Sequence, residues 1–250
     1  MSRTRIALLA LLLVVLAAAP SRADVTMKMT IAMNGPMSMN GTSTIYVKGL
    51  KMRTDVSMMG QEMSLLLDAV AKQQLMLNHG TKVVSTLDPK AAMANLPVTI
   101  GEVTASVKPN DQTKEILGRQ CRGYQVTMTM PLTMGGETVT MTMAGVAWIA
   151  KEGPGVAEYQ AFYKAAGAAG LSVNPMGQGV QSKGMDEMYK ALAEAGLPLL
   201  QELQMSFEGG GQMAAGLAAM AVTTTMTVTE MSAETIPDDK FTVPAGYTKQ

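Results

Sequence analysis

Hydrophobic and polar residues alternate strictly along many short stretches of this chain. In the first such stretch Val25, Met27, Met29, Ile31 and Met33 share one parity, and Thr26, Lys28 and Thr30 lie between them. The same alternation recurs over 50–58, 74–79, 125–130, 138–143 and 225–229. A period of two over four to eight residues is typical of a half-buried β-strand. One apolar and one wet face per strand indicates an antiparallel sheet, so we expect a mainly β (α+β) protein.

Short turn signals separate these stretches. Gly-containing segments of two to eight residues lie at 34–41, 48–49, 59–61, 79–80 and 135–136, and a Lys-Pro-Asn-Asp segment lies at 108–111. Over 25–87 the stretches recur about every ten residues, which predicts an up-and-down meander. We expect the last residues, 241–247, to form an edge strand.

Three segments carry helical signals instead. Residues 88–96 begin with an Asp-Pro pair that suits a helix start, and 156–170 places Val156, Tyr159, Phe162, Tyr163 and Ala166 at helical spacing. The third segment, 183–204, has similar spacing, but Gly196 and Pro198 are expected to break or kink it. Residues 208–216 are expected to be a Gly-rich loop. A one-sided apolar sheet must bury that side, so we expect a curved antiparallel sheet, or half-barrel, whose concave apolar face is covered by two or three helices.

The first 23 residues have the form of a secretory signal peptide. Arg3 and Arg5 precede an apolar run over 6–19, and Ser21 and Ala23 are small residues at a cleavage site. The run is shorter than the roughly 20 residues that a membrane span needs. We therefore expect residues 1–23 to be removed and residues 24–250 to form a single antiparallel β domain, periplasmic or secreted, with no transmembrane anchor after cleavage.

Charge and cysteine content narrow the function classes. Without the three arginines of residues 1–23, the chain keeps 17 basic residues against 20 acidic ones, a formal net charge of −3. This balance offers no basic footprint for nucleic acid. Cys121 is the only cysteine, so no intramolecular disulfide is possible, and we expect it to be buried.

Several segments together resemble a known family. They are the hairpin TIYVKGLKMRTDV (44–56), QQLMLN (73–78), ILGRQCRGYQVTM (116–128) and the terminal FTVPAGY (241–247). The chain resembles a family of secreted bacterial domains of unknown function that looks related to the LolA and LppX lipoprotein-carrier half-barrels. The resemblance implies a half-barrel with helices in its concave apolar face, and a hydrophobic cargo such as an acyl chain.

Methionine, at 25 of 250 residues, is unusually frequent, whereas aromatic residues make up only 4%. One interpretation is that methionine fills the core where larger apolar residues usually do. A second is that flexible thioether chains line a hollow that adapts to an apolar ligand. The candidate ligand-binding residues are those of the alternating stretches, namely Met27, Met29, Met33, Met128, Met130, Met141 and Met143.

A sharper alternative is a soft-metal site, because thioether sulfur prefers Cu(I). In a meander, every second connection lies at the same end of the sheet. The connections at 34–41, 58–62 and 79–81 then share one rim, which gathers Met37, Met39, Met58, Met59, Met63 and His79, the only histidine. This rim is the alternative Cu(I) or Ag(I) site; otherwise no cofactor is expected.

Motifs for catalysis are missing from the sequence. It contains no G-x-S-x-G elbow, no H-E-x-x-H and no P-loop, and we expect no enzymatic activity. The leading hypothesis is an exported binding or carrier protein for a hydrophobic, lipid-like ligand. The alternatives are a Met-rich Cu(I)/Ag(I)-binding envelope protein, and a structural or interaction domain without a ligand that contacts an envelope protein partner.

Overall fold

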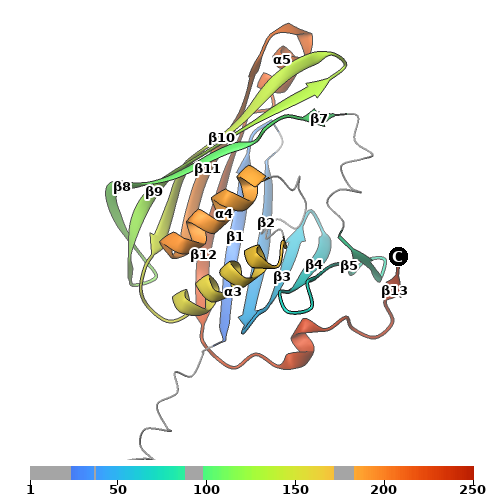
Figure 1. Cartoon of the computed structure of the whole chain (residues 1–250), viewed down its shortest axis with the longest axis vertical. Coiled ribbons are helices and arrows are strands. Elements are labelled where there is room, and N and C mark those ends of the chain that lie inside the picture. The colour runs from blue at the N-terminus through green and yellow to red at the C-terminus, as the bar shows by residue number, and fades with distance from the viewer. Residues whose placement is uncertain (1–23, 37, 88–97, 172–182) are drawn as a thin grey trace, which may run out of the picture.

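The computed structural model describes residues 24–36, 38–87, 98–171 and 183–250 (Figure 1). The expected signal peptide (1–23) and the expected helix at 88–96 therefore lie outside the described residues, as does Met37. Within the described part of the chain, no helix is both long and apolar enough to cross a membrane.

One large sheet of 13 strands organises the described residues. The strands are β1 (Val25–Asn34), β2 (Met39–Lys48), β3 (Lys51–Met58), β4 (Gln61–Asp68), β5 (Gln73–Asn78), β6 (Val83–Thr86), β7 (Thr99–Ile100), β8 (Thr104–Ile116), β9 (Arg119–Met134), β10 (Glu137–Ala150), β11 (Leu197–Gly209), β12 (Val222–Ser232) and β13 (Thr248–Lys249). Their order is β13-β6-β5-β4-β3-β2-β1-β12-β11-β10-β9-β7, with β8 also paired to β9. The pairing is antiparallel except between β13 and β6, so the sheet is open and mostly antiparallel, as the alternation predicts.

The predicted meander is confirmed, because β1 to β6 lie next to one another in chain order. Its tight turns use the left-handed backbone conformation: Met59 and Gly60 between β3 and β4 have φ of 54° and 75°. The same arrangement joins β8 to β9 at Leu117 and Gly118, with φ of 52° and 70°. Two consecutive positive φ values characterise the hairpin turn that matches strand twist.

The prediction of a turn at 108–111 is wrong. Strand β8 continues through this segment, with an irregularity in its pairing to β9 between Pro109 and Thr113. The Asn110 side chain accepts a hydrogen bond from the Gln112 backbone N–H, and the Asn110 carbonyl accepts one from Arg122 of β9. These bonds satisfy the bulged backbone without a chain reversal, so the turn residues produce a β-bulge.

Two longer helices lie side by side across one face of the curved sheet (Figure 1). Helix α3 (Val156–Ala168) buries Val156, Tyr159, Phe162, Tyr163 and Ala166, the residues that the helical spacing singled out. Helix α4 (Lys183–Ala195) packs against β8, β9 and β11. We call the face under α3 and α4 the inner face, and the opposite face the outer face.

The helical stretch expected over 183–204 breaks at Gly196, as expected, because α4 ends at Ala195. Gly196 has φ of 142°, and a Cβ there would lie 2.3 Å from the Ala150 carbonyl oxygen, so the chain turns away from the helix at a position that only glycine fits. Strand β11 then begins at Leu197 and continues with Pro198, which lacks an N–H, and Leu199 and Leu203 are strand residues that point into the core.

Two expectations for the end of the chain are also wrong. The Gly-rich segment expected to be a loop contains the short helix α5 (Gly211–Ala218). Residues 241–247 form no strand; a 3₁₀ turn, η1 (Asp238–Phe241), leads to β13, which adds only two residues beside β6. The C-terminal segment instead packs Val243 and Tyr247 onto an outer-face cluster formed by Leu66, Leu75, Leu77 and Val84.

The main core lies on the inner face in two clusters. One is centred under α3 and joins Phe162 to Val25, Met27, Val47, Leu67 and Leu199. The other is centred under α4 and joins Met188 and Leu192 to Tyr124, Val126, Met128 and Ile149. The inner face is therefore the one that the sheet buries against its own helices.

Close pairing of β10 and β11 depends on Gly145. A Cβ at Gly145 would lie 1.9 Å from the Glu202 carbonyl oxygen, so one of the two strands must shift. We expect Gly145→Ala to lower the free energy of unfolding by about 1–3 kcal/mol. The control is Gly216→Ala in α5, where the added methyl group meets open space. It should raise the free energy of unfolding by up to about 1 kcal/mol. Urea unfolding measures both variants. Equal stability of Gly145→Ala and the wild type would show that the strands do not approach this closely.

Candidate functional site

All seven methionines expected to bind a ligand lie on the inner face. On β1, Met27 belongs to the cluster under α3, Met29 packs at its edge, and Met33 has the same parity. On β9 and β10, Met128 and Met130 belong to the cluster under α4, and Met141 and Met143 pack against it. Alternation along each strand therefore predicts the shared face correctly.

Burial divides the seven into two groups. Met27, Met128 and Met130 are 1%, 3% and 8% exposed, and they serve as core packing between the sheet and the helices. Met29, Met33, Met141 and Met143 are only half-buried. The second group is the part of the predicted set that retains surface for a ligand.

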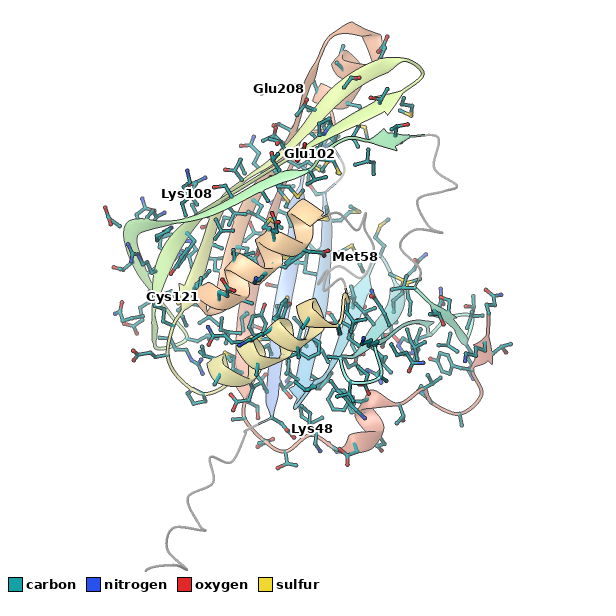
Figure 2. All side chains as sticks on the ribbon, viewed as in Figure 1. Lys48, Met58, Glu102, Lys108, Cys121 and Glu208 are labelled. Atoms are coloured by element: carbon teal, nitrogen blue, oxygen red, sulfur yellow. The ribbon has the colours of Figure 1, made fainter. Side chains whose placement is uncertain are left out.

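The structure adds three half-buried methionines to this group. Met39 pairs with Met33 across β1 and β2, Met205 pairs with Met143 across β10 and β11, and Met226 pairs with Ile31 across β1 and β12. We call Met29, Met33, Met39, Met141, Met143, Met205 and Met226 the methionine face. Figure 2 labels Met58 at the end of β3 and draws the sulfur atoms of the side chains in yellow. Alternation also marks Met205 and Met226 in the sequence, but only the pairing of β10 with β11 and of β1 with β12 places them beside Met143 and Ile31.

The helices that cover the inner face present neutral phenols to it. Tyr159 and Tyr163 of α3 stack with ring centroids 4.4 Å apart, and both are buried. Burial raises the pKa of Tyr159, Tyr163 and Tyr189 of α4 well above the usual tyrosine range. The three phenols are therefore protonated at neutral pH, and they add no charge to this side of the sheet.

The rim residues proposed for a soft metal divide between the two faces. Met39, Met58 and Met63 have inner-face parity, and Met59 is 76% exposed in the β3–β4 turn. His79 lies on the outer face: its Nε2 is 2.6 Å from Ser64 Oγ, and its Nδ1 forms a hydrogen bond with the Tyr247 hydroxyl. Since Ser64 follows Met63 in β4, the two side chains point in opposite directions. Met63 and His79 nevertheless both line a hollow of about 330 Å³, which Met58 and Met59 do not line.

The histidine belongs instead to a polar cluster that sequence reasoning missed. Asp55 accepts hydrogen bonds from Arg53 Nε at 2.5 Å and from Ser64 Oγ at 2.6 Å, and Arg53 also donates to Ser64 Oγ at 3.0 Å. A third Arg53 donor reaches the Lys240 carbonyl at 3.0 Å. The cluster borders an outer-face hollow of about 330 Å³. Alternation could have indicated this cluster, because it places Asp55 of β3, Ser64 of β4 and His79, just after β5, on the same face of the sheet.

The hydrogen bonds of this cluster suit attachment of the C-terminal segment to the sheet better than activation of the Ser64 hydroxyl as a nucleophile. Ser64 is 1% exposed, and its hydroxyl proton is directed to the Asp55 carboxylate. Arg53 and Tyr247 connect the sheet to the segment that carries η1 and β13. Among the described residues, no group of three His, Cys, Asp or Glu side chains is arranged to hold a metal ion.

Cys121 is buried, as expected, with 1% of its surface exposed. Burial raises the pKa of its thiol, and its Sγ lies 3.6 Å from the Arg119 carbonyl oxygen. A protonated, buried thiol in an apolar cluster is an inert packing group.

The fold thus defines a class: an open, mostly antiparallel sheet with helices laid across one apolar face. Solved structures that the chain matches include a LolA superfamily protein from Nitrosomonas europaea, at 9% identity over 89% of this chain and 91% of that chain, with a TM-score of 0.30. A DUF1329 family protein from Desulfovibrio piger matches at 6% identity over 92% and 93%, with a TM-score of 0.33. A putative outer membrane lipoprotein-sorting protein domain from Vibrio parahaemolyticus matches at 7% identity over 93% and 95%, with a TM-score of 0.32.

The LolA superfamily is thus among the structural matches, as the sequence resemblance predicts. No protein-family model and no curated protein sequence matches the chain. Likeness at these identities and TM-scores transfers no ligand and no activity.

Proposed function

We propose that this protein is an exported binding or carrier protein for a hydrophobic, lipid-like ligand. The observation that supports the proposal most is the methionine face, seven half-buried thioether side chains on five strands of the inner face. The expected signal peptide supports export to the periplasm or beyond. The ligand is held by removal of its apolar surface from water, at about 0.8 kcal/mol for each buried methylene.

Methionine suits this task for a physical reason. Its side chain is unbranched and has three rotatable bonds, so neighbouring methionines repack around chains of different shape. Cross-strand pairs such as Met143 with Met205 and Met33 with Met39 place thioether side chains next to one another on adjacent strands. An apolar lining with few polar groups is typical of small-molecule sites.

Displacement of a neutral fluorescent probe tests the proposal. N-phenyl-1-naphthylamine brightens when it leaves water, and decane and methyl decanoate should displace it from the purified protein. Native mass spectrometry of protein isolated from its own host should show a bound lipid-sized molecule. A protein that carries no such molecule and does not bind the probe would contradict the proposal.

One substitution on the methionine face should abolish most of the probe binding. Met143→Glu places a carboxylate among apolar groups, where an unpaired charge is costly, and we expect at least tenfold weaker binding of the probe. Thr142→Glu adds the same charge one residue earlier, on the outer face, and should change affinity by less than twofold. Circular dichroism verifies that both variants fold; equal loss in both would place the binding surface elsewhere.

A further inference from the structure

Two hydroxyl groups on the inner face are buried without a hydrogen-bond partner. Ser43 of β2 is 3% exposed and Thr54 of β3 is 0% exposed, and neither hydroxyl has a partner in the structure. Buried polar side-chain atoms nearly always have at least one partner, protein or otherwise. The exceptions therefore require an explanation.

Their location provides one. Ser43 lies between Met29 of β1 and Val56 of β3, and Thr54 lies between Ile45 of β2 and Leu65 of β4. Across β1 to β4 the row through Thr54 is fully buried, whereas the row through Ser43 contains the half-buried Met29 and Val56. The two hydroxyls thus mark the boundary where the core under α3 ends and the methionine face begins.

The pair is also close enough to act on one group. Ser43 pairs with Val56, two residues along β3 from Thr54, so the two positions are diagonal neighbours about 7 Å apart. An ester has two oxygens, and each accepts a hydrogen bond about 2.8 Å long. One ester group between the two side chains can therefore contact both hydroxyls.

The surroundings select a neutral group. In β1 to β5, every described residue with inner-face parity is uncharged, and so are the buried residues of α3. A carboxylate or phosphate placed here would be buried without a cation, which costs far more than a neutral carbonyl does. Hydroxyls donate to a carbonyl oxygen without any such penalty.

We propose that Ser43 and Thr54 form a polar recognition point for a neutral carbonyl, so that the ligand is a fatty-acyl ester or amide rather than a free fatty acid or a hydrocarbon. The inference rests on the proposed carrier function and specifies its ligand class. The acyl chain extends from this point over Met29 and Met33. Met29 pairs with Ser43, and Met63 lies two residues along β4 from Leu65, the partner of Thr54. Both side chains are flexible and half-buried, so they move aside to admit the carbonyl.

Three ten-carbon competitors test the ligand class by displacement of N-phenyl-1-naphthylamine at pH 8. Methyl decanoate should bind at least tenfold more tightly than decane, and at least tenfold more tightly than decanoate, which is ionised at this pH. A preference for decanoate, or equal binding of decane and methyl decanoate by the wild type, would overturn the inference.

A double variant tests the two residues. Ser43→Ala with Thr54→Val should weaken methyl decanoate at least fivefold and leave decane within twofold. The control Thr44→Val lies on the outer face of the same strand and should alter neither affinity. Because the variant removes unpaired buried hydroxyls, its thermal midpoint should equal or exceed that of the wild type.

The outcomes separate the two proposals. If the wild type binds neither decane nor methyl decanoate, the carrier function itself is wrong. If the wild type binds both and the double variant weakens both equally, the carrier function stands and the recognition point is wrong. Loss of thermal stability in the double variant would also overturn the inference, since it would mean that the hydroxyls already have partners.

Discussion

Phe162→Ala should lower the free energy of unfolding by about 3–5 kcal/mol, among the largest effects expected of any single substitution in this chain. Phe162 is fully buried at the centre of the cluster that joins α3 to β1, β2, β4 and β11. Its ring contacts Tyr163 edge-on, with centroids 5.8 Å apart and planes at 86°. Removal of the ring leaves a cavity between rigid strands, which cannot collapse around it as a surface site can.

Phe207→Ala is the matched control, because the same atoms are removed from a half-buried position on β11. We expect a loss of less than half the Phe162→Ala value, since Phe207 buries less surface and leaves a smaller cavity. Urea unfolding followed by circular dichroism measures both. Equal losses would show that α3 is not docked on the inner face as described.

The strands and the docking face of α3 could be predicted because both depend on local periodicity. Val25 to Met33 alternate strictly, and the five buried residues of α3 recur at helical spacing, so each pattern reports its own element. The order of β1 to β6 follows from short turns that leave no choice of partner. Periodicity therefore supplied the meander and the helix that covers it.

The pairing of strands that are distant in the sequence could not be predicted from local periodicity. Leu197 to Met205 contain leucines at both helical and strand spacing, and the segment is a strand because β10 and β12 pair with it on either side. Thr248 and Lys249 are strand residues only because β6 offers them an edge. No local pattern in these segments encodes which other strand of the sheet becomes the partner.

The candidate site shows the same division. Alternation placed the methionines of β1, β9 and β10 on one face, but it did not show which of them the helices cover. It also grouped Leu75, Leu77 and His79 on one face without revealing that this face is outer and receives Tyr247 from the C-terminal segment. The face of a strand on which a residue lies follows from the local sequence, whereas the segment that packs against that face does not.

Removal of the Asp55 carboxylate is expected to be the second severe substitution. Arg53 is 8% exposed, and its Nε donates to Asp55 Oδ1 at 2.5 Å, while its remaining donors reach Ser64 and Lys240. Asp55→Ala leaves the guanidinium buried without its counter-ion and removes one of the hydrogen bonds of the Ser64 hydroxyl. Breaking a buried pair in this way typically costs 3–5 kcal/mol, and because Asp55 is partly exposed we expect about 3 kcal/mol.

An exposed ion pair and a double variant distinguish the effect of a buried, unpaired charge from the loss of a contact alone. Glu230→Ala breaks the Lys28–Glu230 bridge, in which both side chains are more than half exposed, and should cause only a small change. Arg53→Met combined with Asp55→Ala removes the stranded cation and should recover part of the stability that Asp55→Ala loses. If the double variant is less stable than Asp55→Ala alone, Arg53 stabilises the outer face through its bonds to Ser64 and to the Lys240 carbonyl, and the buried charge is not the origin of the loss.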